Sequence, residues 1–432
     1  MKDYFEEIVG YEDIKNELRI ISDMLNNPET YRKLGAELKE GVILSGKPGT
    51  GKTTMANCLI RSIGRETYVC RKNSSDGDFI KTINNAFQSA KMNTPSIVLL
   101  DDLDKFSEKE EECDAEELAA VQSCIDEVKG SDVFIIATVN SIRKIPDSLL
   151  RPGRLGKRIH VRLPRCKEAT EIVRHYMSKL ETCDDLDEES VARMLDGESC
   201  ATLESVINNA AMKAAYNRQS CINMQNVIDA CLDIIFEVPK GGEELSEEAK
   251  LRVAYHEAGH ALASEVLNPG SVSIISIRKA DGKYGFVRYL RKEEYEDIYS
   301  DYNESIIKTS LAGKAATELV FGEADMGANA DLHNAFNKAV ELVDNMCMYG
   351  FDNWIQDKYS SSFSAENRNR AMAMVLEKNY LEVKKLLVEN RELLDKIADA
   401  LIRNTTLTFS DVQYICKTKC TSLNLKRAGK QR

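Results

Sequence analysis

Short, largely apolar runs alternate with helix-like segments along the first part of the chain. Residues 41–45, 96–100 and 132–137 each have the length and composition of a strand that is buried on both faces. Longer segments with helical periodicity separate these runs, and such alternation is typical of a parallel sheet covered by helices. Residues 1–165 are therefore predicted to form a doubly wound α/β domain.

The pattern then changes. Between residues 166 and 238 the strand-like runs disappear and helical patterning takes over, which predicts a small helical domain. Residues 239–245 combine proline, glycine and charged residues, so they are predicted to be a linker. Residues 246–432 are mainly helical again, with strand-like interruptions at 272–277 and 285–290. This part is predicted to be a separate, mainly α domain.

Composition excludes several classes of protein. Of the 432 residues 43% are hydrophobic, which is enough for the cores of two or three domains. A net charge of -12 argues against a nucleic-acid-binding protein, which normally carries a basic face. No run approaches the roughly 18–20 apolar residues that span a bilayer, and the N-terminus lacks the apolar core of a signal peptide. No membrane anchor and a cytoplasmic location are therefore expected.

A phosphate-binding loop follows the first strand-like run. Its sequence, G-K-P-G-T-G-K-T at 46–53, fits G-x-x-x-x-G-K-[ST] and is followed by a helix-compatible segment. The glycines allow backbone N–H groups to surround phosphate oxygens, while Lys52 reaches the β- and γ-phosphates and Thr53 ligates Mg²⁺. The residues assigned to ATP on this basis are Gly46, Pro48, Gly49, Thr50, Gly51, Lys52, Thr53 and Thr54.

Polar residues follow the next two strand-like runs. Asp101 and Asp102 come directly after the second run, where P-loop ATPases hold magnesium and polarise the attacking water. Asn140 follows the third run and is a candidate to hydrogen-bond the γ-phosphate or its water. Arg151 and Arg154 lie further on in a loop and suit the stabilisation of phosphoryl charge on a neighbouring subunit.

A second motif lies in a helix-like apolar stretch about two hundred residues beyond the loop. His256 and His260 stand four positions apart with Glu257 between them, and positions i and i+4 share one face of a helix. Both imidazoles can therefore reach one metal ion while Glu257 serves as a general base. Gly259 costs about 1 kcal/mol relative to alanine inside a helix, so it is expected to serve close packing. The pattern indicates a zinc metallopeptidase.

A catalytic zinc site needs a third protein ligand and one open position. Asp331 and Glu318 are the main downstream candidates, and their residue types and spacing do not decide between them. His333 is a weaker choice because positions i and i+2 point apart on a helix. The twelve cysteines form no C-x-x-C pair, so no second zinc site is expected.

The order of these motifs resembles that of the FtsH family of AAA+ ATP-dependent zinc metalloproteases. The similarity runs from Tyr4 to about Ile415. It includes the phosphate-binding loop and the histidine motif. Four further segments also match: F-E-E-I-V-G at 5–10, residues 97–104, A-T-V-N at 137–140 and L-L-R-P-G-R at 149–154. The resemblance implies an AAA+ P-loop domain with a helical lid, followed by a mainly α zinc-metallopeptidase domain. It also implies one Zn²⁺ per subunit, ATP with Mg²⁺, a homo-hexamer, and unfolded or tagged proteins as substrates.

The resemblance also assigns roles to single residues. It implies that Ile8, Val9 and Gly10 line the adenine pocket and that Arg151 and Arg154 complete the ATP site of the neighbouring subunit. The stretch G-A-N-A-D-L at 327–332 matches the family's G-A-x-N-D-L, whose aspartate binds zinc, although an alanine replaces the usual asparagine at position 330. This favours Asp331 as the third ligand and leaves Glu318 a supporting role. Residues 285–290 resemble the strand along which the family binds its substrate.

Three features depart from the family's pattern. Asp102 stands where glutamate is usual, one methylene shorter, and slow ATP turnover is expected unless the backbone or Asp104 compensates. The pore loop that grips substrate is shortened; Phe79 and Ile80 are the candidates for the grip, and a core anchor is the alternative for Phe79. Most members also have transmembrane helices before the ATPase, and this sequence has none there.

Three functions are therefore compared. The leading one is an ATP-dependent zinc endopeptidase that unfolds and degrades proteins. The second is a zinc peptidase whose weakly hydrolysing ATPase mainly orders the ring. The third is an ATP-dependent unfoldase or scaffold with a vestigial peptidase site, which the complete histidine motif disfavours.

Overall fold

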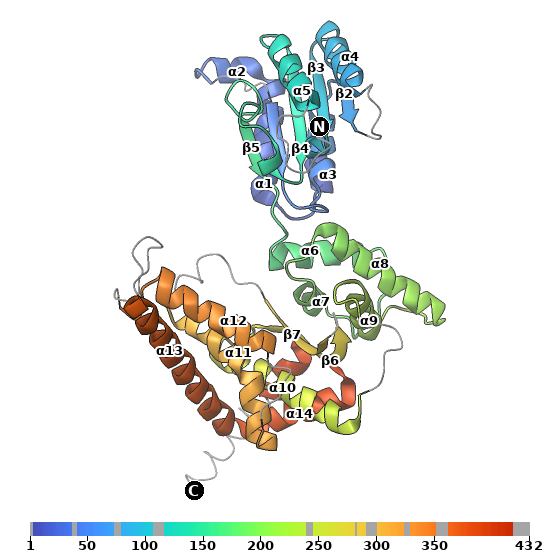
Figure 1. Ribbon diagram of the computed structural model, residues 1–432. Coiled ribbons are helices and arrows are strands. Elements are labelled where there is room, and N and C mark those ends of the chain that lie inside the picture. Colours follow the sequence, from blue (N-terminus) through green and yellow to red (C-terminus); the bar gives the residue numbers. More distant parts are fainter. Residues whose placement is uncertain are drawn as a thin grey trace. The chain divides into compact units, whose positions relative to one another are not determined.

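The computed structural model describes residues 3–36, 41–72, 79–106, 116–238, 245–280, 283–290, 300–323, 329–350 and 362–417 (Figure 1). Its internal contacts divide the chain into two compact units. Unit 1 comprises Met1–Thr182 and Gly197–Ile222, and unit 2 comprises Cys183–Asp196 and Asn223–Arg432. This division passes through residues 166–238, the segment assigned to a lid from the sequence. The four-part domain organisation therefore stays a prediction.

Unit 1 is built on a sheet of five parallel strands: β1 (Gly41–Ser45), β2 (Glu66–Arg71), β3 (Ser96–Asp101), β4 (Val133–Val139) and β5 (Lys157–His160). Their order in the sheet is β2-β3-β4-β1-β5. Every residue of β1, β3 and β4 is buried, as the continuous apolar runs of these central strands predict.

Helices cover both faces of this sheet. α4 (Phe79–Met92) and α5 (Glu116–Glu127) bury their apolar sides against the face that carries Ile43 and Ile135. α3 (Lys52–Ile63) contacts β1 and β4 from the other face, and α1 (Glu12–Asn26) packs against α3. The predicted doubly wound α/β fold is thus confirmed. The remaining elements of unit 1 are η1 (Tyr4–Glu7), α2 (Pro28–Arg32), η2 (Leu103–Lys105), η3 (Ile142–Lys144), α6 (Cys166–Met177) and α8 (Cys200–Tyr216).

Phe79, one candidate for the substrate grip, is instead part of the core of unit 1. It is the first residue of α4, its side chain is 9% exposed, and its ring meets that of Phe106 edge-on at a centroid distance of 4.7 Å. Ile80 is half-buried. Residues 76–78, which precede Phe79 in the proposed loop, lie outside the described residues. A phenylalanine committed to the core has no free face for a substrate, so the prediction for Phe79 is wrong and the core-anchor alternative holds.

Unit 2 is mainly helical. Its helices are α7 (Glu188–Met194), α9 (Met224–Ile234), α10 (Glu247–Leu267), α11 (Ser300–Phe321), α12 (Asn329–Val340), the π-helical η6 (Glu341–Asn345), α13 (Ser362–Glu389) and α14 (Arg391–Asn404). Its small sheet contains β6 (Val272–Ala280), β7 (Lys283–Tyr289) and β8 (Thr406–Thr408), paired antiparallel in the order β7-β6-β8. β7 is therefore an edge strand among the described residues.

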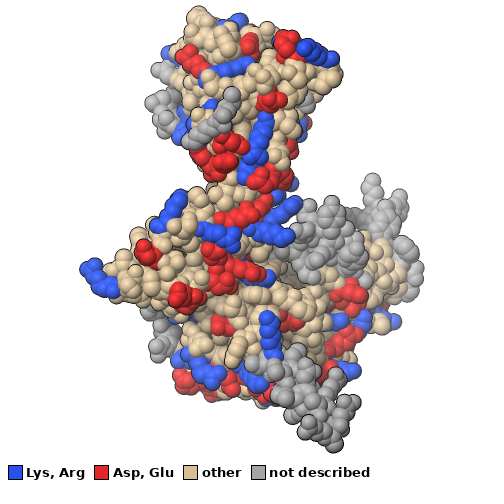
Figure 2. Space-filling view, turned by 180° about the vertical axis from the view of Figure 1, so that it is seen from behind, with Lys and Arg blue, Asp and Glu red and all other residues tan. Residues whose placement is uncertain are grey.

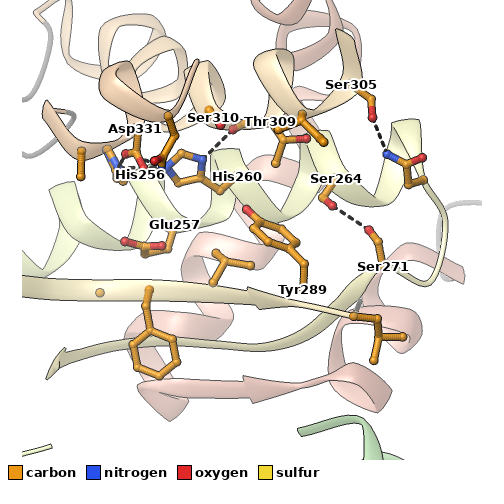
Figure 3. A pocket seen from close by; sticks show the side chains of 18 of the residues that line it. His256, Glu257, His260, Ser264, Ser271, Tyr289, Ser305, Thr309, Ser310 and Asp331 are labelled. Atoms are coloured by element: carbon orange, nitrogen blue, oxygen red, sulfur yellow. Dashed lines mark hydrogen bonds and ion pairs between the residues drawn. The ribbon is translucent and has the colours of Figure 1, made fainter. Parts of the chain in front are cut away.

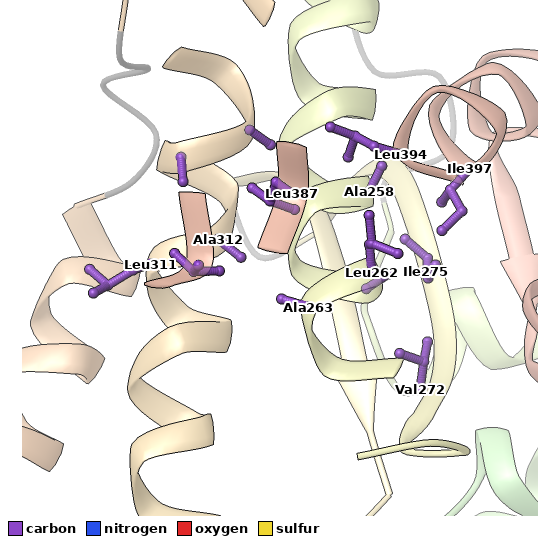
Figure 4. Close-up of a cluster of buried hydrophobic side chains, with 14 of the residues drawn as sticks. Ala258, Leu262, Ala263, Val272, Ile275, Leu311, Ala312, Leu387, Leu394 and Ile397 are labelled. Atoms are coloured by element: carbon purple, nitrogen blue, oxygen red, sulfur yellow. The ribbon is translucent and has the colours of Figure 1, made fainter. Parts of the chain in front are cut away.

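Small residues allow α10 and α11 to pack closely. Ala263 of α10 and Ala312 of α11 are fully buried, and Figure 4 shows them on the sides of the two helices that face each other. Gly259 is essential to this contact, because a Cβ atom there would lie 2.6 Å from the carbonyl oxygen of Ala312 and 2.6 Å from the Cβ of Ala316. The packing role predicted for Gly259 is thus confirmed, and it explains a glycine in the middle of a helix.

The surface adds two observations. Among the described residues, no helix combines the length and the apolar character that crossing a membrane requires. Figure 2 shows acidic and basic side chains interspersed over the described part of the face that it presents.

Candidate nucleotide site and metal centre

The phosphate-binding loop joins the end of β1 to α3, which begins at Lys52. Two of its glycines, Gly49 and Gly51, have φ angles of 75° and 90°, which other residues rarely adopt. Gly46 is required for a different reason, because a Cβ atom there would lie 2.0 Å from the carbonyl oxygen of Val161. The backbone can therefore follow the tight turn that phosphate binding needs.

Lys52 is folded back onto this loop. Its side chain is almost fully buried, and its ammonium donates to the carbonyl oxygens of Gly46 at 2.8 Å and Lys47 at 2.9 Å. A third bond, of 2.9 Å, reaches the side-chain oxygen of Asn140 at the end of β4. Burial lowers the pKa of Lys52, so each of these bonds helps to keep it charged. Lys52 and Asn140, both predicted to face the γ-phosphate, thus lie together.

Asp101 is the buried centre of the site. Its Oδ1 atom accepts hydrogen bonds from Thr138 at 2.7 Å and Thr53 at 3.2 Å, and its Oδ2 atom accepts one from the Nε of Arg71 at 2.8 Å. Burial raises the pKa of Asp101, but Arg71 and the hydroxyl donors outweigh burial and hold the pKa below its usual value. A carboxylate beside the hydroxyl of Thr53 offers the oxygen ligands that Mg²⁺ prefers. The residues present therefore fit the expected magnesium site.

Sequence reasoning missed Arg71 and Thr138. Arg71 ends β2 in register with Asp101 at the end of β3, and β4 brings Thr138 to the other side of the same carboxylate. The order of strands in the sheet makes these residues neighbours. Nothing in the linear sequence specifies that order, because each strand is separated from the next by a helix.

Asp102 adopts a left-handed backbone conformation, with a φ of 54°. Aspartate tolerates this region better than most residues. Its carboxylate pairs with Lys105 at 2.7 Å and accepts a longer bond of 3.4 Å from the side-chain nitrogen of Asn140. The nearby Asp104 is buried and accepts the backbone N–H of Asn140 at 3.0 Å. The carboxylate of Asp104 is thus already bonded to the backbone at the end of β4.

The two loop arginines differ in their surroundings. Arg154 forms a bidentate pair with Asp126, at 2.9 and 2.7 Å, and donates to the carbonyl oxygen of Ser148. Arg151 is exposed and, among the described residues, makes no ion pair. Arg151 is therefore available to another molecule, whereas Arg154 is already held within its own unit.

The segment expected to hold adenine lies after η1. Ile8 is buried and its carbonyl oxygen accepts a bond from Lys15 at 3.1 Å. Val9 is half-buried. Gly10 has a φ of 71°, and a Cβ atom added at this position would lie 3.1 Å from the Cβ of Glu168. The segment is thus held against α6, with backbone geometry that favours glycine at its end.

The metal centre is formed by α10 and α12. His256 and His260 project from one face of α10, and their Nε2 atoms lie 3.1 Å apart. Asp331, near the start of α12, places its Oδ2 atom 3.1 Å from the Nε2 of His256 and 3.2 Å from that of His260 (Figure 3). Tetrahedral zinc with bonds of about 2.0–2.2 Å holds its ligand atoms about 3.3–3.5 Å apart. The spacing and the donor types therefore fit zinc.

Contacts behind the ligands orient the two imidazoles. The Nδ1 atom of His260 lies 2.7 Å from the carbonyl oxygen of Thr309, so this nitrogen carries the proton and leaves Nε2 free to bind a metal. On α11, Gly313 leaves the space that the rings occupy, because a Cβ atom there would lie 2.5 Å from the Nε2 of His260 and 2.6 Å from that of His256. Gly313 is a site residue that sequence reasoning missed.

The structure brings Asp331, and not Glu318, to the histidines. Glu318 instead pairs with Lys384 at 2.8 Å and with Lys314, and it also accepts a bond from Tyr380. Lys384 and Tyr380 lower the pKa of Glu318 to about 2. His333 is exposed on α12. The two histidines outweigh burial and hold the pKa of Asp331 below its usual value, so its carboxylate is ionised and ready for a cation.

Glu257 lies beside the ligands and is 5% exposed. Burial raises its pKa to about 8, an effect that the charge of His260 opposes and that of Asp331 reinforces. Gly285 on β7 makes room for this carboxylate: its φ is 81°, and a Cβ atom there would lie 2.5 Å from the Oε1 of Glu257. Glu257 and the edge strand β7 thus face each other across the same site.

The site opens into a cavity of about 660 Å³. Its walls come from α10, β7, α11 and α12, and they include both histidines, Glu257, Asp331 and Tyr289. Since β7 has no strand partner on its outer edge among the described residues, an extended peptide can pair there and cross the metal centre.

Comparisons with known proteins agree with both sites. Residues 42–163 match the model of the ATPase family associated with various cellular activities (AAA), and residues 243–415 match peptidase family M41. ATP-dependent zinc metalloprotease FtsH of Lachnoclostridium phytofermentans is 31% identical, over 95% of this chain and 74% of the relative. FtsH 2 of Thermoanaerobacter sp. (strain X514), with the same activity in its name, is 28% identical over 95% of this chain and 82% of the relative.

Replacement of Gly313 by alanine is expected to weaken zinc binding by about 10- to 100-fold, the range typical of changes to groups that orient metal ligands. The added methyl displaces both imidazoles. Chelator competition and metal analysis measure the effect. Lys314→Met is the control, because the Lys314 ammonium contacts Glu318 and Tyr380 rather than the metal ligands. Equal zinc affinity in Gly313→Ala and the control would contradict the assignment.

Replacement of Glu257 by glutamine is expected to change the pH dependence of stability in the zinc-free protein. Because the pKa of Glu257 rises from 4.5 to about 8 on folding, its contribution to stability is present below pH 4.5 and is lost as the pH rises to 8. Glutamine does not titrate. The Tm of Glu257→Gln should therefore equal that of the wild type near pH 4.5 and exceed it near pH 8, in thermal unfolding with EDTA. A difference that is independent of pH would argue against a protonated Glu257.

Proposed function

Because this chain belongs to the FtsH family of ATP-dependent zinc metalloproteases, we propose that its two sites couple ATP hydrolysis to the unfolding and cleavage of protein substrates. One observation carries the proposal: His256, His260 and Asp331 meet at zinc-ligand spacing beside the buried carboxylate of Glu257. A scaffold with a vestigial peptidase site has no need for this arrangement.

In the proposed reaction, His256, His260 and Asp331 hold zinc. When bound, zinc polarises the scissile carbonyl and lowers the pKa of water at the site. Glu257 removes a proton from the attacking water, whose oxygen forms a bond to the carbonyl carbon. Glu257 then delivers the proton to the amide nitrogen as the C–N bond breaks, which leaves a carboxylate and an amine. With zinc held by His256, His260 and Asp331, its charge would favour the ionised form of Glu257 that the first of these steps needs.

The substrate is proposed to bind as an added strand on the outer edge of β7. Backbone pairing at this edge is independent of side chains and therefore suits a protease that accepts many unfolded sequences. Gly285 keeps the backbone close to Glu257, since a larger residue would occupy the space of the carboxylate. Binding at this edge thus brings a scissile bond to the general base.

The ATP site is proposed to work as in other P-loop ATPases. The loop at 46–51 and Lys52 bind the phosphates, Thr53 and Asp101 hold Mg²⁺, and residues 8–10 contact adenine. Asp102 and Asn140 orient the attacking water. The ammonium of Lys52 donates to the carbonyl oxygens of Gly46 and Lys47. To bind the phosphates, Lys52 is proposed to replace these hydrogen bonds by bonds to phosphate oxygens.

We also propose a homo-hexamer that acts on unfolded or tagged proteins. In such a ring Arg151 and Arg154 reach the ATP of the neighbouring subunit. The guanidinium of Arg151 is exposed and makes no ion pair within the described part of the chain, which supports its role. Arg154 must first leave Asp126, so its contribution is expected to be the smaller of the two.

Casein degradation tests the proposed function. Casein should be cleaved in the presence of ATP and more slowly with a slowly hydrolysed ATP analogue. EDTA should stop cleavage, and added zinc should restore it. Lys52→Ala is expected to abolish ATP-driven cleavage, whereas Lys47→Ala, an exposed lysine of the same loop, should retain it. Glu257→Gln should lower the rate by about 10²–10⁴-fold while ATP hydrolysis continues. Equal cleavage with ATP and the analogue would favour the ring-ordering ATPase, and no zinc-dependent cleavage would overturn both peptidase functions.

Replacement of Asp102 by glutamate is expected to raise the kcat for ATP by about 10- to 100-fold, since a displacement of about 1 Å can cost a hundredfold. The additional methylene is expected to move the carboxylate away from the ammonium of Lys105 and closer to the attacking water. Steady-state ATPase measurements test this, with nucleotide affinity as the control for binding. An unchanged or lower kcat would mean that this chain positions water by other groups.

A further inference from the structure

Tyr289, the last residue of β7, lines the cavity of the metal centre. Side chains alternate along a strand, so it shares a face with Gly285 and Val287. Gly285 abuts Glu257, and Val287 packs on the core that includes α10. Figure 3 shows the ring of Tyr289 rising from β7 with its hydroxyl toward His260.

The opposite face of β7 is occupied in other ways. Phe286 stacks on Phe236 at a centroid distance of 4.0 Å, and Arg288 donates to the carbonyl oxygen of Asp196 at 2.5 Å. The strand therefore constrains the orientation of Tyr289, because Phe286 and Arg288, which alternate with Val287 and Tyr289 along β7, are anchored to the other face.

The hydroxyl of Tyr289 has no hydrogen-bond partner among the described residues, whereas three serine hydroxyls of the same cavity do. Ser264 and Ser271 bond to each other at 2.6 Å, and Ser305 donates to the carbonyl oxygen of Tyr302 at 2.6 Å. Tyr289 is 36% exposed, and it turns its unpaired donor into the cavity where substrate binds.

The surroundings keep this hydroxyl protonated. Removal of the hydroxyl from water within the cavity raises the pKa of Tyr289, and the carboxylates of Glu257 and Asp331 raise it further. The hydroxyl is consequently a donor, and not a phenolate, at neutral pH. A neutral donor next to two carboxylates is suited to meet a negative charge that appears only during reaction.

We propose that Tyr289 is a further catalytic residue, whose hydroxyl donates a hydrogen bond to the oxyanion of the tetrahedral intermediate of peptide hydrolysis. The water oxygen bonds to the carbonyl carbon, the π pair of the carbonyl moves onto its oxygen, and Glu257 takes the water proton. Tyr289 gives up no proton; its O–H stabilises the new negative charge. As the C–N bond breaks, the pair returns to form the carbonyl and Glu257 protonates the departing nitrogen.

This role predicts a specific kinetic effect, because a donor aimed at the oxyanion is stronger in the transition state than in the ground state. Removal of one such donor costs about 10²–10³ in kcat. Tyr289→Phe should therefore lower the kcat for peptide cleavage by about this factor and leave KM within about threefold. Tyr414→Phe is the matched control, because Tyr414 also belongs to unit 2 but is exposed and does not line the cavity.

Binding measurements on the full-length, zinc-loaded protein separate this role from a structural one. A phosphinic peptide, which mimics the tetrahedral intermediate, should bind Tyr289→Phe about 10²- to 10³-fold more weakly, while a cleavage-product peptide binds equally well. Zinc content, Tm and ATP hydrolysis should match the wild type. A kcat within threefold of the wild type, a loss confined to KM, or unchanged binding of the phosphinic peptide would each overturn the proposal.

The inference rests on the proposed peptidase function, and the two can fail separately. If the wild type shows no zinc-dependent cleavage, the proposed function fails. If the wild type cleaves and Tyr289→Phe cleaves equally well, the peptidase stands and the role of Tyr289 is overturned.

Discussion

The metal centre depends on how closely α10 and α11 approach each other. Gly259 permits the contact, since any side chain there would enter the backbone of α11. Gly313, on the facing helix, leaves the space in which the imidazoles of His256 and His260 meet. The close packing that stabilises unit 2 is thus the same packing that sets ligand spacing. Gly285 has the same effect on β7: because it has no side chain, the carboxylate of Glu257 can lie against this strand.

The nucleotide site of unit 1 depends on a different constraint, the convergence of parallel strands at one edge of a sheet. The ends of β2, β3 and β4 bring Arg71, Asp101 and Thr138 into contact. Buried charges need partners, and both Lys52 and Asp101 have them within the protein.

The departures from the family's pattern have separate structural consequences. Asp102 keeps its carboxylate near Asn140 but shares it with Lys105, so the group proposed to orient water is both shorter than glutamate and partly occupied. Phe79 packs in the core against Phe106. In the peptidase domain Ala330 replaces the family's usual asparagine, but the proposed general base and the three candidate ligand atoms all lie within one cavity.

The sequence by itself determined the class of fold and most of the chemistry. Continuous apolar runs identified the central strands of unit 1, and the spacing of His256 and His260 placed both on one face of α10. Both patterns can be recognised from neighbouring residues in the sequence, without knowledge of the tertiary contacts. Only the tertiary structure brought Asp331 to the histidines and Glu318 to Lys384. It alone revealed the surroundings of Gly313, Arg71 and Tyr289. These arise from helix contacts, strand order and the face of a strand on which a residue lies, which join residues far apart in the chain and leave no local pattern.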